Sequence, residues 1–410
     1  MSDARHSRFD FAAPDTVLRI ERAALVIGVL GAAACIVGAI VEPAQHFLRS
    51  YLVGFMYWLG VTLGCLAILM VAHLTTAHWG FVVRRILEAA SLNIFMMALL
   101  FLPILAGVYR LYPWANPDAL AKDGMIQHQH AWLNPGGFAL RALLYFALWC
   151  LFAFLLNKWS WAQDKPGAPA YRERYQNLSA VGLLLYVFTM TFASVDWMMS
   201  LDPHWKSTIY GFYIEAGQGL NGFAFVTVIA ALLIAYQPMS EVLTKEHLHD
   251  LGKLMFAFLI LWAYMAFSQG LIYWSTNLPE EISWYRNRMT GAWWMVGAVL
   301  LFGQFFLPFF VLLGQEIKRK AATVAAVALW MMLMRWFDLY YLIIPNFDDT
   351  RGALSFSWVN VASTLGIGGL WVALFFRNLR LHPLVAEHDP MFHVVLESEH
   401  EAAHAGGQHD

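Results

Sequence analysis

The hydrophobic positions of the chain gather into long apolar runs that are separated by shorter polar segments. A helix needs about 20 mostly apolar residues to cross the hydrocarbon layer of a membrane. The runs therefore predict an all-α membrane protein of ten spans, since they are too long and too evenly apolar for the strands of a membrane barrel. The predicted spans cover residues 22–41, 51–72, 84–110, 136–157, 178–198, 217–236, 252–275, 290–313, 321–343 and 357–377.

The composition agrees with many membrane crossings. Of the 410 residues, 60% are hydrophobic and only 13% are charged, whereas soluble domains carry about 25% charged residues. The 18 Trp and 16 Tyr suit a protein with many lipid–water boundaries. A net charge of −2 gives no support for binding nucleic acid.

The placement of Lys and Arg predicts the orientation. Of the 26 such residues, 17 lie on the side of the N-terminus and 8 on the other side, while Arg335 falls inside the ninth span. Because positively charged segments stay in the cytoplasm, both termini are expected there. Residues 1–21 form an N-terminal segment whose mixed charge is unlike that of a signal peptide. Residues 22–377 form the membrane domain, and residues 378–410 form a polar tail. The histidines of this tail can bind metal, but a disordered tail is the simpler interpretation.

No metal cofactor is predicted within the spans. Cys35, Cys65 and Cys150 stand singly in apolar runs, whereas zinc sites, iron–sulfur clusters and disulfides need grouped cysteines. None of the 15 histidines lies in the middle of a predicted span. A haem held between two histidines of facing helices is therefore not expected.

Ionisable groups at the outer end of the fifth span are candidates for proton transfer. Asp196 lies a turn or two inside the membrane, and Asp202 and His204 follow at the turn that leaves it. A histidine between carboxylates can exchange protons near neutral pH. The competing interpretation is a solvated helix end.

Arg335 and Asp338 form a second candidate site, in the ninth span. Their i,i+3 spacing puts both on one helix face. Asp338 lies about 25 Å along the helix from Ala321, at nearly the depth of Asp196. This match suggests two related four-helix bundles, spans 2–5 and 6–9, flanked by two peripheral helices. A structural ion pair is the alternative to a proton or quinone site.

Two further groups of polar residues are candidates with weaker patterns. Gln269, Asn277, Glu280 and Glu281 follow the seventh span beside aromatic residues, which suits the rim of a quinone site or a docking surface, although acids in a loop are often only solvated. His73, His78 and Glu88 gather near the cytoplasmic side as the mouth of a proton half-channel. The alternative for Glu88 is a salt bridge with Arg84, four residues earlier.

Two motifs give the chain a family resemblance. The segments 196–205 (DWMMSLDPHW) and 277–281 (NLPEE) resemble the NrfD/PsrC-like membrane protein ActF of bacterial alternative complex III, a quinol:cytochrome c or high-potential-acceptor oxidoreductase. The resemblance spans all ten helices. It implies a location in the bacterial inner membrane, with a second, homologous NrfD-like membrane protein as partner. It also implies periplasmic iron–sulfur and multihaem cytochrome c proteins, which hold all haems and clusters. The redox partner that it implies is a quinone such as menaquinone.

The function expected from these features is support of quinol oxidation within such a complex, with conduction of protons through half-channels. The first alternative is a membrane scaffold for the redox subunits, in which the ionisable groups only lock helices together. A secondary transporter ranks last. Such proteins contain paired broken helices, whereas only Gly366, Gly368 and Gly369 in the tenth span and Pro308 in the eighth suggest a break.

Overall fold

The computed structural model describes residues 15–164, 171–278 and 282–385, and within these ranges the chain is helical and contains no β-strand. Within the same ranges, ten stretches are long and apolar enough to cross a membrane, which confirms the predicted all-α membrane fold. The stretches are α2 (Asp15–Val41), α3 (Ala44–Thr75), α5 to α7 (Arg84–Ser91, Ile94–Leu100, Leu102–Ala106), α11 (Pro135–Gln163), α12 with η2 (Arg172–Trp197, Met199–Leu201), α13 (Tyr210–Leu233), α15 (Lys245–Thr276), α17, η3 and α18 (Trp293–Val299, Leu300–Phe306, Leu307–Leu313), α20 with η4 (Ala321–Ile343, Ile344–Asn346) and α21 (Trp358–Arg380).

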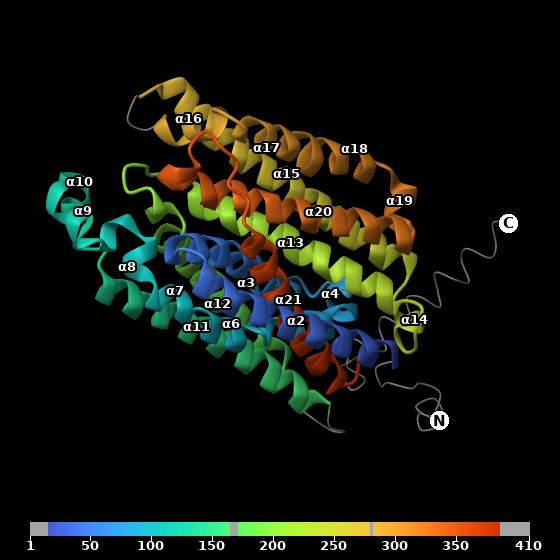
Figure 1. Ribbon diagram of the computed structural model, residues 1–410. Helices are drawn as coiled ribbons and strands as arrows, with labels where there is room; N and C mark the ends of the chain where they lie inside the picture. Colours follow the sequence, from blue (N-terminus) through green and yellow to red (C-terminus); the bar gives the residue numbers. More distant parts are fainter. Residues whose placement is uncertain (1–14, 165–170, 279–281, 386–410) are drawn as a thin grey trace, which may run out of the picture.

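The spans lie side by side in alternating directions (Figure 1). We call the end at which α2 begins and α21 ends the terminal face, and the opposite end the loop face. Short helices connect the spans on both faces. They are α4 (His78–Val82), α8 (Val108–Leu111), η1 (Pro113–Ala115), α9 (Pro117–Lys122), α10 (Gly124–Gln129), α14 (Met239–Val242), α16 (Ser283–Met289), α19 (Gln315–Arg319) and η5 (Asp348–Thr350).

The spans form two groups of four that meet along α3 and α13. The first group is α3, α5–α7, α11 and α12, and the second is α13, α15, α17–η3–α18 and α20. In both α3 and α13, 83% of the most apolar stretch is buried, more than in the other spans. Their backbones approach closely at Gly64 and Gly222. A side chain at Gly64 has no room there, since its Cβ would collide with the carbonyl of Gln218. Small residues allow such close packing within a membrane.

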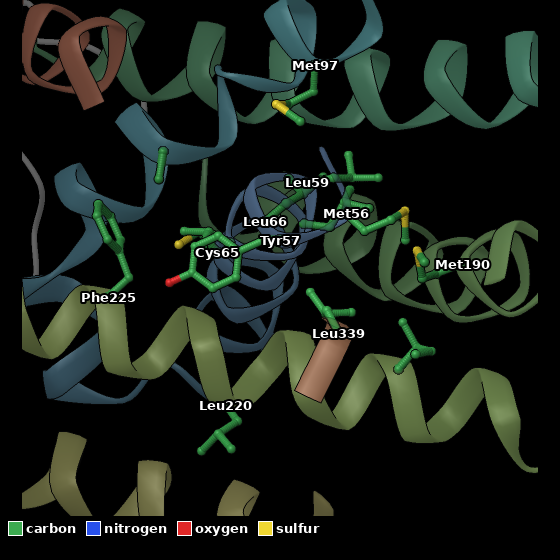
Figure 2. Close-up of a cluster of buried hydrophobic side chains, with 14 of the residues drawn as sticks. Met56, Tyr57, Leu59, Cys65, Leu66, Met97, Met190, Leu220, Phe225 and Leu339 are labelled. Atoms are coloured by element: carbon green, nitrogen blue, oxygen red, sulfur yellow. The ribbon is translucent and has the colours of Figure 1, made fainter. Parts of the chain in front are cut away.

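Apolar side chains fill the junction of the two groups (Figure 2). Met56 of α3 lies next to Met190 of α12, and the same buried cluster includes Leu59 and Leu66 of α3 and Leu339 of α20. The junction therefore ties spans from both groups to α3.

The glycines of the tenth span serve helix packing. Gly366 and Gly369 of α21 lie against Gly31 and Gly28 of α2, and a Cβ at any of these positions would meet the other helix's backbone. α21 continues as one helix through this region. The glycine-rich segment that had suggested a broken helix is therefore a contact between the first and tenth spans.

Several boundaries differ from the prediction. α2 begins at Asp15, α3 at Ala44, α13 at Tyr210 and α15 at Lys245, each earlier than expected. In α13, the polar residues of the first turns lower the local hydropathy, although most of them are buried against neighbouring helices. The third span is divided into short helices, and Pro103 lies in the first turn of α7, where its missing N–H is tolerated.

Candidate functional site

Asp338 is the centre of a buried polar site between α13, α15 and α20. Its Oδ1 accepts a hydrogen bond from the Tyr213 hydroxyl at 2.6 Å, and its Oδ2 accepts one from the Trp262 indole at 2.9 Å. The Arg335 guanidinium pairs with the same Oδ2. Asp338 is fully buried, so the arginine supplies the counter-charge that a buried carboxylate requires.

A glycine on α13 makes room for the Arg335 side chain. A Cβ at Gly217 would overlap the guanidinium of Arg335. The sequence Tyr213-Ile214-Glu215-Ala216-Gly217 therefore presents a tyrosine hydroxyl and, one turn later, a gap on the same helix face. The Tyr213 hydroxyl binds Asp338 of α20, and the gap at Gly217 accommodates the Arg335 side chain of the same helix.

A cavity of about 710 Å³ lies beside Asp338. Its walls come from α13, α15, α17, η3, α18 and α20, and they are apolar apart from Asp338 and the polar atoms of Tyr213, Trp262, Tyr264 and Tyr341. The rim includes Tyr264 and Phe267, which are 61% and 69% exposed on the outer surface of the bundle. The cavity thus connects the membrane-facing surface with a buried carboxylate.

The eighth span shapes this cavity through a π-helical segment. η3 forms i→i+5 hydrogen bonds over Leu300–Phe306, and its Leu300, Leu301 and Phe305 line the cavity. Segments of this kind widen a helix by one residue per turn and recur at functional sites. Pro308 follows in the first turn of α18.

Asp196 is the centre of a second site, in the first group of spans. Its carboxylate accepts hydrogen bonds from Trp132 at 2.9 Å, from Arg141 at 2.8 and 2.9 Å, and from Tyr145 at 3.0 Å. Arg141 and Tyr145 lie one turn apart on α11, and Trp132 precedes that helix. The Arg141 side chain is 15% exposed and that of Asp196 is fully buried.

The predicted grouping of Asp196 with Asp202 and His204 is not what the structure shows. His204 pairs with Asp123 of the preceding loop at 2.9 Å, and the Asp202 side chain accepts a hydrogen bond from the backbone N–H of His204. The chain turns after η2 and directs these groups to the exposed loop face. Asp196 instead takes its partners from α11 and the segment before it.

Glu88 is buried at the terminal face between two arginines. Arg84 Nε lies 2.8 Å from one carboxylate oxygen and Arg85 Nη1 lies 2.9 Å from the other, so the expected salt bridge with Arg84 is present. Arg85 also pairs with Asp164. Burial raises the pKa of Asp164 above its ordinary value despite the opposing charge of Arg85.

The structure brings His73 to this cluster and leaves His78 apart. The His73 ring stacks on Tyr175 at 4.6 Å, and Tyr175 accepts a hydrogen bond from Arg84 at 2.9 Å. His78 is exposed at the start of α4, close to His247 of α15. The inner candidate site therefore consists of Glu88 and His73 with two unforeseen arginine-bound residues, Tyr175 and Asp164.

Two of the remaining predicted residues, Gln269 and Asn277, lie at the end of α15. Gln269 is buried and accepts a hydrogen bond from Ser207 at 3.0 Å. Asn277 ends the helix in a left-handed conformation, with φ 48°, and is exposed. Glu280 and Glu281 lie outside the described residues. None of the described members of this group lines the Asp338 cavity.

Arg288 is a further buried charge that the sequence did not single out. It donates to the carbonyls of Tyr341 and Leu342 and to the side chain of Asn346, at 3.1, 2.8 and 2.9 Å. Burial lowers its pKa to about 10, so it stays charged at neutral pH. A cation beside the last carbonyls of a helix is favourable, and Arg288 thereby fixes the end of α20 beyond Asp338.

Other partners of the two aspartates were also missed: Tyr213, Trp262, Trp132, Arg141 and Tyr145. One local signal could have found two of them. Arg141 and Tyr145 have i,i+4 spacing in the first turns of the fourth span, and an arginine at that depth requires a partner. Tyr213 and Trp262 are aromatic residues among many and carry no such signal.

The fold and its polar sites define a multi-pass, all-α membrane protein with buried carboxylates in both four-span groups. No protein-family model and no curated protein sequence matches the chain.

Proposed function

We propose that this chain is a membrane component of a respiratory quinol:acceptor oxidoreductase, and that the cavity beside Asp338 takes up the quinol. The observation that carries the proposal is an apolar cavity that begins at the membrane-facing surface and ends on a buried carboxylate. Its volume of about 710 Å³ lies within the range of small-molecule sites, roughly 300–1,000 Å³.

The chemistry of a quinol suits both ends of this cavity. A quinol has an aromatic ring with two hydroxyl groups and an apolar side chain that dissolves in lipid. The ring can pack against aromatic walls, while a hydroxyl donates to Asp338. The Oδ1 atom of Asp338 accepts one described hydrogen bond, from Tyr213, and a carboxylate oxygen has room for a second.

Oxidation of a quinol releases two electrons and two protons. In this proposal Asp338 receives a proton from the bound hydroxyl, and Arg335 holds the carboxylate in place. The electrons pass to haems or iron–sulfur clusters of partner proteins at the loop face. The resemblance to the ActF protein of alternative complex III supports this division, with a homologous NrfD-like membrane protein beside the chain, the bacterial inner membrane as location and the terminal face in the cytoplasm.

The buried carboxylates of the first group extend the proposal to protons. Glu88 lies near the terminal face and Asp196 near the loop face of the same four spans. We assign them to two half-channels, one toward each side of the membrane. In the scaffold alternative, the same groups only lock helices together.

A pair of substitutions on α15 tests the quinol site. Ala263 lines the cavity, whereas Ala257 is exposed on the same helix away from it. Ala263→Trp in the purified complex should lower quinol turnover at subsaturating quinol by about tenfold or more, which equals a loss of about 1.4 kcal/mol. Ala257→Trp should leave turnover unchanged.

Quinol turnover and the yield of assembled complex together separate the quinol-site proposal from the scaffold alternative. Wild-type turnover in assembled Ala263→Trp complex would overturn the quinol site. A second variant, Asp338→Asn with Arg335→Gln, removes the carboxylate without leaving a buried charge alone. Reduced yield with normal activity of the surviving complex would favour a scaffold.

A further inference from the structure

Glu215 is a membrane carboxyl that none of the sites above uses. It lies in α13, five residues after the helix begins, and its side chain is partly exposed. Its Oε1 accepts a hydrogen bond from the Thr191 hydroxyl of α12 at 3.0 Å. The hydrogen bond therefore holds Glu215 at the seam between the two four-span groups.

The surroundings of Glu215 differ from those of the other acids deep in the spans. Glu88, Asp196 and Asp338 each pair with at least one arginine. Among the described residues, no Lys, Arg or His nitrogen lies within 4.0 Å of Glu215. The titratable neighbour on α12 is Tyr186, whose phenol is neutral at physiological pH.

The carboxyl belongs to the membrane-facing surface of the bundle. Phe212, three residues earlier on α13, is 47% exposed, and Phe192, next to Thr191 on α12, is 44% exposed. Tyr213, two residues before Glu215, points to Asp338. Residues two apart lie on nearly opposite sides of a helix, so Glu215 faces away from the Asp338 cavity.

We propose that Glu215 is a proton-exchanging carboxyl open to lipid, and that it is the residue of this chain that a hydrophobic carbodiimide modifies. An isolated charge at membrane depth is costly, whereas an arginine partner compensates a buried carboxylate and favours its ionised form at rest. Among the residues that the structure describes, the hydrogen-bond partner of Glu215 is the neutral Thr191 hydroxyl. Glu215 can therefore take up and release a proton without breaking an ion pair.

The modification follows directly from this chemistry. The protonated carboxyl adds across one C=N bond of dicyclohexylcarbodiimide: a carboxyl oxygen bonds to the central carbon, and the acid proton moves to nitrogen. The resulting O-acylisourea rearranges by transfer of the acyl group to nitrogen and gives a stable N-acylurea. No oxidant or leaving group is needed, since the reaction is an addition.

Membranes that contain the full chain in its native complex provide the test. They are treated with dicyclohexylcarbodiimide, and the modified residue is located by mass spectrometry of peptides. We expect the adduct on Glu215 and its loss in Glu215→Gln, an isosteric change that keeps an acceptor for Thr191. A water-soluble carbodiimide should modify loop acids and leave Glu215 unmodified.

Mapping of the modified residue in the wild-type chain tests the proposal even if the Glu215→Gln variant fails to fold. An adduct on Asp196, Asp338 or Glu88 in place of Glu215 would overturn the proposal. Absence of any adduct within the spans would do the same. The outcome is independent of quinol binding, because the label reports only on a protonated carboxyl that lipid can reach.

Discussion

Asp196 and Asp338 accept hydrogen bonds from the same three kinds of side chain: a tryptophan indole, a tyrosine hydroxyl and an arginine guanidinium. Asp196 takes its tyrosine and arginine from one neighbouring helix. Asp338 takes its arginine from its own helix and its tyrosine from α13. The two sites are thus alike in chemistry and different in construction.

The two arginines should differ in their effect on stability. Arg335→Gln leaves the fully enclosed Asp338 without a counter-charge, and breaking such a pair costs about 3–5 kcal/mol. Arg141→Gln should cost less, since the Arg141 side chain is 15% exposed, whereas that of Arg335 is 2% exposed. Thermal unfolding of the detergent-solubilised protein measures both. An equal or larger loss for Arg141→Gln would contradict the difference in burial.

Gly217 should be intolerant of any side chain. Gly217→Ala places a Cβ in the space of the Arg335 guanidinium, and overpacking of this kind costs about 1–3 kcal/mol. The matched control is Gly270→Ala on α15, where the added Cβ meets only the Tyr285 ring at 3.9 Å. Unfolding temperatures should fall for the first variant alone, and a wild-type value for Gly217→Ala would be the opposing result.

The contact between the first and tenth spans should depend on its glycines. Gly369→Leu introduces a side chain where the α2 backbone at Gly28 lies, so it should separate α2 from α21 and lower the unfolding temperature. Ala33→Leu adds a similar volume to the exposed side of α2 and should have little effect. Equal effects of the two variants would show that α2 does not need this packing.

Asp349 should make stability depend on acid pH. Its partial burial acts to raise its pKa, but the hydrogen bonds and charge of Arg49, aided by His46, outweigh this and hold the pKa below its ordinary value. Such a group contributes stability that is fully present above its unfolded pKa of about 3.9 and is lost as pH falls through the lower folded pKa.

The measurement compares wild type with Asp349→Asn in thermal unfolding from pH 6 to the acid limit of solubility. Wild type should be the more stable near neutral pH, and the difference should shrink once the pH falls below about 4. A difference that stays constant with pH would exclude an ionised Asp349 as its source.

The spans could be predicted because each one is long and apolar enough by itself. The start of α13 could not be predicted, since Glu215 interrupts the apolar run just before the predicted start of this span at residue 217. The aspartates could be identified as unusual at membrane depth. Their partners could not, because Trp132 lies 64 residues from Asp196 and Tyr213 lies 125 residues from Asp338.

Proximity in sequence misled the prediction for Asp202 and His204. These residues follow Asp196 closely, but a helix that ends and turns directs later side chains elsewhere. Here His204 reaches Asp123, which precedes the fourth span. The contact depends on how α10 and the segment after η2 meet at the loop face, and such long-range packing has no periodic pattern in the sequence.

The most direct test of the central claim is photolabelling of native membranes with an azido-quinone. If the cavity beside Asp338 takes up quinol, cross-links should map to residues 260–267 of α15 or 300–309 of η3 and α18, which supply most of the lining. Excess quinol should suppress these cross-links. Cross-links confined to other spans, or unaffected by excess quinol, would contradict the account.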